Sequence, residues 1–118
     1  MTIERVRLAE IVHQAPIPIL VLRGAALLVE RANDLFQSLA AGAAAEGQPL
    51  DEALASVPEV ARGVREALDK DAAWTSSPTA VAKGAGCSGR CVFIARPLHE
   101  AGLAAGVVVY VSDFEDAR

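Results

Sequence analysis

The longest helical pattern lies in the middle of the chain. After Ser56, apolar residues fall at positions i, i+3, i+4, i+7 and i+11, with charged residues on the opposite side; they are Val57, Val60, Ala61, Val64 and Leu68. Ser56 followed by Glu59 has the spacing of a capping box, so we expect a helix with Ser56 as its N-cap. Packing on a sheet is the simplest explanation of its apolar stripe.

Three shorter segments also have helical patterns. In residues 2–14 the apolar positions Ile3, Val6, Leu8, Ile11 and Val12 approximate the helical period, and Pro16 follows, which predicts an amphipathic helix. Asp34 and Gln37 have capping-box spacing, which predicts a short helix capped by Asp34. Residues 48–52 begin with a proline followed by acidic residues, as the first turn of a helix does.

Five segments have the alternating or short, continuous apolar patterns of strands. They are residues 17–22, 26–31, 79–83, 90–96 and 105–112. We expect a hairpin between the first two, an end of the fourth at Pro97, and a turn over residues 99–102 before the fifth. Because these connections are short, the strands are predicted to be antiparallel.

Length and charge narrow the class of protein. The chain has 118 residues, which suits one compact domain. A formal net charge of −4 without a basic cluster argues against nucleic acid or an anionic membrane as a partner. There is no apolar run of the roughly 20 residues that a membrane span needs and no secretory pattern, so we expect a cytoplasmic protein.

The order of helix, two strands, short helices and three strands resembles a PAS sensor domain over nearly the whole chain. The matching stretches are residues 14–19, 31–36, 47–50, 96–98, 106–109 and 112–114. The resemblance implies an α+β fold: a five-stranded antiparallel sheet with helices packed on one face, flanked by the helix over residues 2–14. It also implies that the two N-terminal strands are central in the sheet, beside the last strand. We divide the chain into residues 1–15, a possible dimer contact, and a PAS-like domain over residues 16–118.

The resemblance implies a non-catalytic sensory and dimerisation module of a signal-transduction protein, such as a sensor histidine kinase of a two-component system or a transcriptional regulator. The expected partners are a second copy of the chain and a downstream output domain. A small apolar ligand could lie between sheet and helix. The apolar residues that we expect to line its cavity are Phe36, Leu39, Leu54, Val60, Val64 and Phe93.

Two alternatives remain open at this point. The chain could be a ligand-free dimerisation module that uses residues 2–14 as its contact. It could also be a thiol switch, since Cys87 and Cys91 flank a glycine-rich turn and could meet if that turn folds back. The simpler interpretation of the two cysteines is that Cys91 is buried and Cys87 lies in an exposed loop.

No cofactor is expected from the motifs. Haem-binding PAS domains place a histidine on the long helix, whereas residues 57–71 contain neither His nor Met. Flavin photoreceptors carry a reactive cysteine within a helix, and both cysteines here lie outside the predicted helices. His13 and His99 are too few and too distant for a structural zinc site. The glycines at 84, 86 and 89 precede a strand instead of opening a helix, which argues against a dinucleotide site.

Overall fold

The computed structural model describes residues 17–39, 45–55, 57–80 and 90–113, except for the side chains of Leu39, Ala80 and Asp113. Its elements are β1 (Ile19–Arg23), β2 (Leu28–Ala32), α2 (Asp34–Leu39), α3 (Leu50–Ala53), α4 (Pro58–Lys70), β3 (Trp74–Thr75), β4 (Thr79–Ala80), β5 (Arg90–Glu100) and β6 (Leu103–Asp113). The predicted helix over residues 2–14, the predicted capping residue Ser56 and Cys87 lie outside the described residues.

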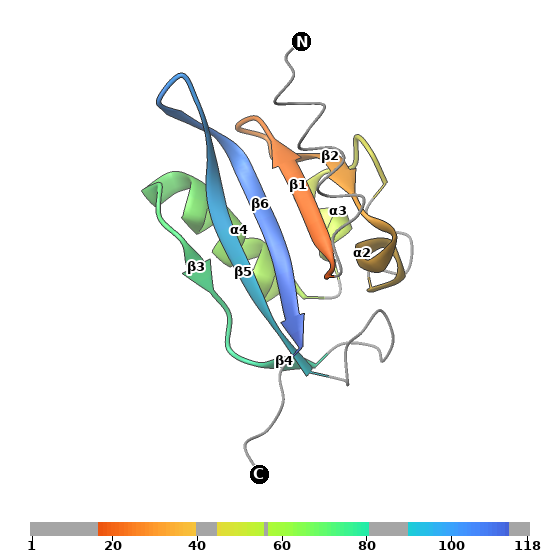
Figure 1. Ribbon diagram of the computed structural model, residues 1–118. Coiled ribbons are helices and arrows are strands. Elements are labelled where there is room, and N and C mark those ends of the chain that lie inside the picture. Colours follow the sequence, from red (N-terminus) through yellow and green to blue (C-terminus); the bar gives the residue numbers. More distant parts are fainter. Residues whose placement is uncertain (1–16, 40–44, 56, 81–89, 114–118) are drawn as a thin grey trace.

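All strands belong to one antiparallel sheet with the order β2-β1-β6-β5-β3, and β4 also pairs with β5. The short strands β3 and β4 follow the same edge of β5, so together they fill one position, and the sheet has five positions across (Figure 1). This arrangement confirms the predicted five-stranded α+β architecture. One detail was wrong: β1 is central beside β6, as expected, but β2 lies at the edge.

The last two strands are longer than the sequence predicts. β5 continues through Pro97 to Glu100, and β6 already begins at Leu103. Among the described residues, β3 pairs with β5 only at Ala95 and Ile94, so no strand borders β5 at Pro97 on the side away from β6. Proline is tolerated at such an edge because its missing N–H interrupts no ladder. The hairpin turns through Ala101 and Gly102, both at positive φ.

The helices cover one face of the sheet. In Figure 1 the sheet faces the reader, and α4 crosses behind β5 and β6. α4 contacts β5, β6 and β3, while α3 contacts α4 and β2. The core between the layers takes the inward-facing residues of the strands, among them Leu20, Leu22, Cys91, Phe93, Ala95, Val107, Val109 and Val111. No helix in the described ranges is long and apolar enough to span a bilayer.

Asn33 joins β1 to α2. Its side-chain oxygen accepts hydrogen bonds from the backbone N–H of Phe36 (3.0 Å) and of Ile19 (3.1 Å), and its amide nitrogen donates to the carbonyl of Ile17 (2.7 Å). Asn33 is therefore the N-cap of α2, and the prediction that Asp34 caps this helix was wrong by one residue. Asn33 satisfies backbone groups on both sides, which fixes the helix against the start of the strand.

The start of α4 also differs from the prediction. Its N-cap is Val57, which makes no side-chain capping hydrogen bond, and Pro58 occupies the first turn. Proline suits this position because the first N–H of a helix has no intrahelical acceptor. The helix ends at Asp71, which adopts the left-handed conformation with φ of 51°.

Candidate functional site

The interior between the sheet and the helices contains the predicted lining residues that the structure describes. Phe36, Leu54, Val60, Val64 and Phe93 are each at most 2% exposed, and they belong to one continuous apolar core. They come from α2, the end of α3, α4 and β5, so the fold brings together residues far apart in sequence. The side chain of Leu39 is not among those described. That these residues line a ligand cavity stays a prediction.

Periodicity explains why these side chains meet. On α4, Val60, Val64 and Ala67 recur at one-turn spacing and are all buried against the sheet. On β5, Phe93 lies on the same face as Cys91 and Ala95, two positions before and after it, and all three side chains point into the core. The interior is thus enclosed between the apolar face of α4 and the apolar face of β5.

Cys91 lies inside this core. Its side chain is fully buried, and in the sheet it stands opposite Thr79 on one side and Asp113 on the other. Cys87 lies outside the described residues, so the proposed pairing of the two cysteines stays a prediction. The burial of Cys91 agrees with the simpler interpretation of that residue.

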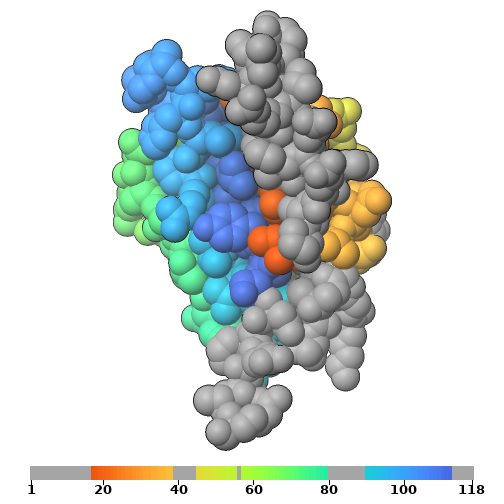
Figure 2. Space-filling view, viewed as in Figure 1, coloured from red at the N-terminus to blue at the C-terminus, as the bar shows by residue number. Residues whose placement is uncertain are grey.

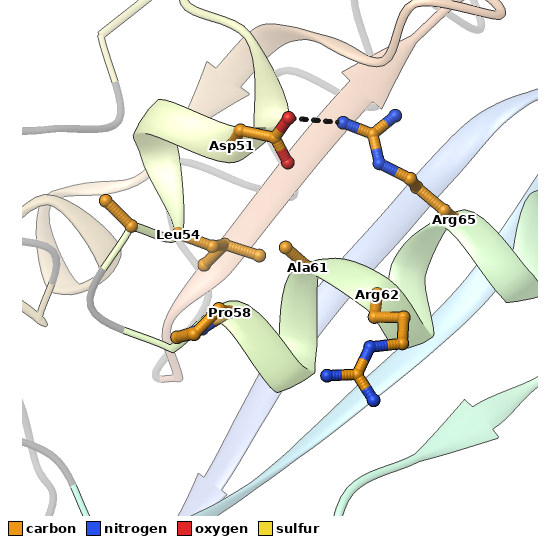
Figure 3. Close-up of a pocket in the computed structure, with 7 residues that line it drawn as sticks. Asp51, Leu54, Pro58, Ala61, Arg62 and Arg65 are labelled. Atoms are coloured by element: carbon orange, nitrogen blue, oxygen red, sulfur yellow. Dashed lines mark hydrogen bonds and ion pairs between the residues drawn. The ribbon is translucent and has the colours of Figure 1, made fainter.

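A groove of about 380 Å³ lies between α3 and α4, on the side of the helices away from the sheet (Figure 3). Residues Pro58, Ala61, Arg62 and Arg65 of α4 line it, and their i, i+3, i+4, i+7 spacing places them on one helix face. Asp51, Leu54 and Ala55 line the opposite wall. This groove, which we call the α3–α4 groove, combines an apolar floor with a charged rim.

The charges of the α3–α4 groove are unevenly paired. Arg65 Nη2 donates to Asp51 Oδ2 at 2.7 Å, an ion pair that bridges the two helices (Figure 3). Within the described part of the chain, Arg62 makes no hydrogen bond or ion pair. Because the groove has two guanidinium groups and one carboxylate, its rim carries a net positive charge.

The sequence patterns do not reveal this groove. Arg62 and Arg65 belong to the charged side of the predicted helix, opposite its apolar stripe, and the helix dipole accounts for Asp51 in the first turn of its helix. The available signal was the placement of Pro58 and Ala61 on the same face as the two arginines, since a wholly solvated face has no need of apolar residues. That signal becomes informative only when α3 is known to lie against this face.

A wider hollow of about 740 Å³ lies at the end of the β1–β2 hairpin. It is crossed by ion pairs from Arg23 Nε to Glu30 Oε1 (2.6 Å) and from Arg23 Nη1 to Glu100 Oε2 (2.9 Å). These contacts connect β1 with β2 and with the tip of the β5–β6 hairpin. We therefore interpret this hollow as a structural junction between two hairpins.

Among the residues that the structure describes, no group of three or more His, Cys, Asp or Glu side chains is placed to hold a metal ion. His99 Nε2 lies 2.6 Å from Asp71 Oδ1, which joins the β5–β6 hairpin to the end of α4. Because both side chains are half-exposed, we interpret this contact as a structural link between the β5–β6 hairpin and the end of α4.

Comparison with known proteins places the fold. Neither the profiles of protein families nor the curated proteins give a match by sequence. The PAS domain of BvgS from Bordetella pertussis superposes with a TM-score of 0.71 at 16% identity, covering 98% of this chain and 89% of that one. A sensory box sensor histidine kinase from Vibrio cholerae gives a TM-score of 0.62 at 19% identity, covering 94% and 92%.

The phage VqmA–DPO complex is a further structural neighbour, with a TM-score of 0.70 at 18% identity; the match covers 93% of this chain and 53% of VqmA. The chain thus spans about half the length of VqmA and most of the length of the two other neighbours. These similarities, together with the strand order and the one-sided helical layer, show that the chain has the PAS fold. The resemblance drawn from the sequence is confirmed.

Proposed function

We propose that this chain is the sensory PAS module of a signal-transduction protein and that it binds a small apolar ligand between the sheet and α4. The observation that carries the proposal is the shared apolar interior, which α2, α3, α4 and β5 close with fully buried side chains. The neighbours support it, because they include a PAS domain of BvgS, a sensor histidine kinase, and VqmA solved as a complex with DPO.

The proposed mechanism is a shift of population. Apart from the contact between His99 and Asp71 at its C-terminal end, α4 is held to β5 and β6 by side-chain packing among the contacts described above. A ligand that enters between them therefore favours one packing of helix and sheet over another. The change then reaches an output domain through the elements that border the interior. The ligand must bind the two packings with different affinities, since equal affinities would shift nothing.

Native mass spectrometry tests the ligand directly. We expect gently purified protein to carry a non-covalent adduct that disappears on denaturation. Ala95 is fully buried in the core, so Ala95→Val should reduce the adduct by occupying space in the interior. Ala104→Val is the matched control, because Ala104 is exposed on β6 and its substitution should leave the adduct unchanged. A protein that shows only its apo mass, with an interior filled by its own side chains, would overturn the proposal.

We also propose that the module forms a homodimer through the outer face of the sheet. Ile19, Tyr110 and Ile94 stand side by side on β1, β6 and β5, facing away from the helices, and all three are partly exposed. Figure 2 views the molecule from this side and shows the surface that β5 and β6 present. An apolar row across three strands is the kind of surface that a second copy would cover.

Light scattering after size-exclusion chromatography tests the dimer. Ile94→Glu should shift the mass toward the monomer, whereas Glu59→Gln, at an exposed position of α4 on the helical side of the molecule, should leave it unchanged. A chain lacking residues 2–14 separates the two possible contacts: a monomer would assign the contact to that segment, and a dimer that Ile94→Glu still disrupts would assign it to the sheet. A dimer insensitive to Ile94→Glu contradicts the proposal for the sheet face.

A further inference from the structure

We infer that the α3–α4 groove is a second ligand site, separate from the interior, and that it binds a small carboxylate with a short aliphatic chain. The inference rests on the floor of the groove, on its unevenly paired charges and on its size. The groove opens on the side of α4 away from the sheet, so a ligand in it does not require a ligand in the interior, although Leu54 and Ala61 of its floor also belong to the core.

The floor suits an aliphatic chain. Leu54 and Ala61 are nearly buried, with 2% and 6% exposure, and lie at the bottom of the groove between the helices. Pro58 and Ala55 extend this apolar surface toward solvent. Such a surface is stabilised by covering it, at roughly 25 cal/mol per Å² of apolar area removed from water.

The rim suits a carboxylate. Arg62 lines the groove and has no ionic partner among the described residues. Figure 3 shows its guanidinium on the side of α4 away from Asp51, and this exposed side chain can turn toward a ligand in the groove. Arg65 is paired with Asp51, but the two side chains are 44% and 70% exposed, and exposed pairs are weak. A ligand carboxylate can therefore take the place of Asp51 on Arg65 or bind Arg62 alone. Guanidinium groups bind carboxylates through two parallel hydrogen bonds, which gives the site selectivity for this group.

The size of the groove favours a small molecule over a protein segment. Its volume of about 380 Å³ lies within the range of small-molecule sites, which is roughly 300–1,000 Å³. One turn of α3 and two turns of α4 bound the groove. The groove is therefore shorter than the row of side chains that a docked helix presents.

Titration with octanoate, followed by calorimetry and by ¹H–¹⁵N spectra of the whole chain, tests the inference. We expect saturable binding with the largest shifts at the amides of Ala55 and Ala61, and weaker binding as salt is raised. Octanol, which has the same chain without the charge, should bind more weakly and without salt dependence. Arg62→Gln should weaken octanoate binding about fivefold, the scale of one exposed charge pair.

Asp51→Asn is the decisive variant, because it releases Arg65 from its internal partner. It should strengthen octanoate binding by about twofold to fivefold. Arg96→Gln, which removes the same charge from the outer face of the sheet, is the control and should have no effect. The inference is overturned if octanoate does not bind saturably, if Arg62→Gln and Arg65→Gln leave its affinity unchanged, if Asp51→Asn weakens it, or if Arg96→Gln weakens it as much as Arg62→Gln.

Discussion

The indole ring of Trp74 lies against Gly63 of α4 and occupies the position that the Cβ of any other residue at position 63 would take. A glycine inside a helix costs about 1 kcal/mol relative to alanine, so its presence in the middle of α4 needs a local reason. The reason here is that the missing side chain lets the ring pack on the helix and lets β3 reach the edge of β5. Trp74 thereby closes one end of the core.

Gly63→Ala should destabilise the protein. The added Cβ overlaps the indole ring, and overpacking of this kind costs about 1–3 kcal/mol, of which the better helix propensity of alanine offsets at most about 1 kcal/mol. Urea unfolding followed by circular dichroism measures the loss, and the fluorescence of Trp74, the single tryptophan of the chain, reports the displaced ring.

The sign of this effect should reverse when the ring is absent. In a Trp74→Ala background the clash is gone, so the further change Gly63→Ala should stabilise the helix by about 0.5–1 kcal/mol. If Gly63→Ala destabilises both backgrounds equally, the contact with Trp74 is not the reason for the glycine.

Gly106→Ala should be more damaging, because the obstacle is main chain. A Cβ at this position of β6 would overlap the carbonyl oxygen of Leu22 on β1. A backbone carbonyl cannot rotate away as a side chain can, so we expect a loss near the upper end of the overpacking range, about 3 kcal/mol. Ala104→Ser, an exposed change on the same strand, should stay within about 0.5 kcal/mol. Unfolding free energies of the three proteins decide this, and a mild effect of Gly106→Ala would mean that β1 and β6 can separate locally.

The large features of this fold follow from patterns in the sequence. Alternation on β5 and the long apolar run of β6 predict two strands of the sheet, and the spacing of Val60 and Val64 by one helical turn predicts the helix that covers it. Those same rules select the buried interior residues, since residues that share a face share an environment. The five predicted lining residues whose side chains are described are buried in the core, and that they line a ligand cavity stays a prediction.

The sequence-based predictions were wrong or incomplete where tertiary contacts determine the local structure. Trp74 and Thr75 form a strand because the indole ring packs on Gly63. No local pattern over two residues can predict such a contact. The cap of α2 is Asn33 and not Asp34, because Asn33 alone also reaches the backbone of β1. The α3–α4 groove was missed for the same reason, since it exists only between two helices whose relative position the sequence does not encode locally.

Asn33→Ala should cost about 2–4 kcal/mol. The substitution removes the N-cap of α2, typically about 1 kcal/mol, and leaves the N–H of Ile19 and the carbonyl of Ile17 without their partner, at about 1–3 kcal/mol for a buried group. Asn33→Asp keeps the acceptor and loses the donor, so its effect should fall between those of the wild type and alanine. Chemical unfolding of each variant gives the values.

Asp34→Ala is the control for this assignment. Asp34 is exposed in the first turn of α2 and contributes through the helix dipole, worth about 0.3–1 kcal/mol. We therefore expect a loss of less than about 1 kcal/mol. An equal effect of Asn33→Ala and Asp34→Ala would contradict the assignment of Asn33 as the cap and as the link to β1.

Cys91 should react with thiol reagents only when the protein unfolds. Its side chain is fully buried on β5, and reactivity requires both access to the reagent and a thiolate, which an apolar environment disfavours. In a Cys87→Ser variant, where Cys91 is the single thiol, we expect the reaction with an aromatic disulfide reagent to be about a hundredfold or more slower in buffer than in concentrated urea. A Cys91→Ala variant reports the other thiol under the same conditions. Fast labelling of Cys91 in the folded protein, or a wild-type mass lower by two hydrogens after oxidation without loss of structure, would favour the thiol switch over a purely structural role for this cysteine.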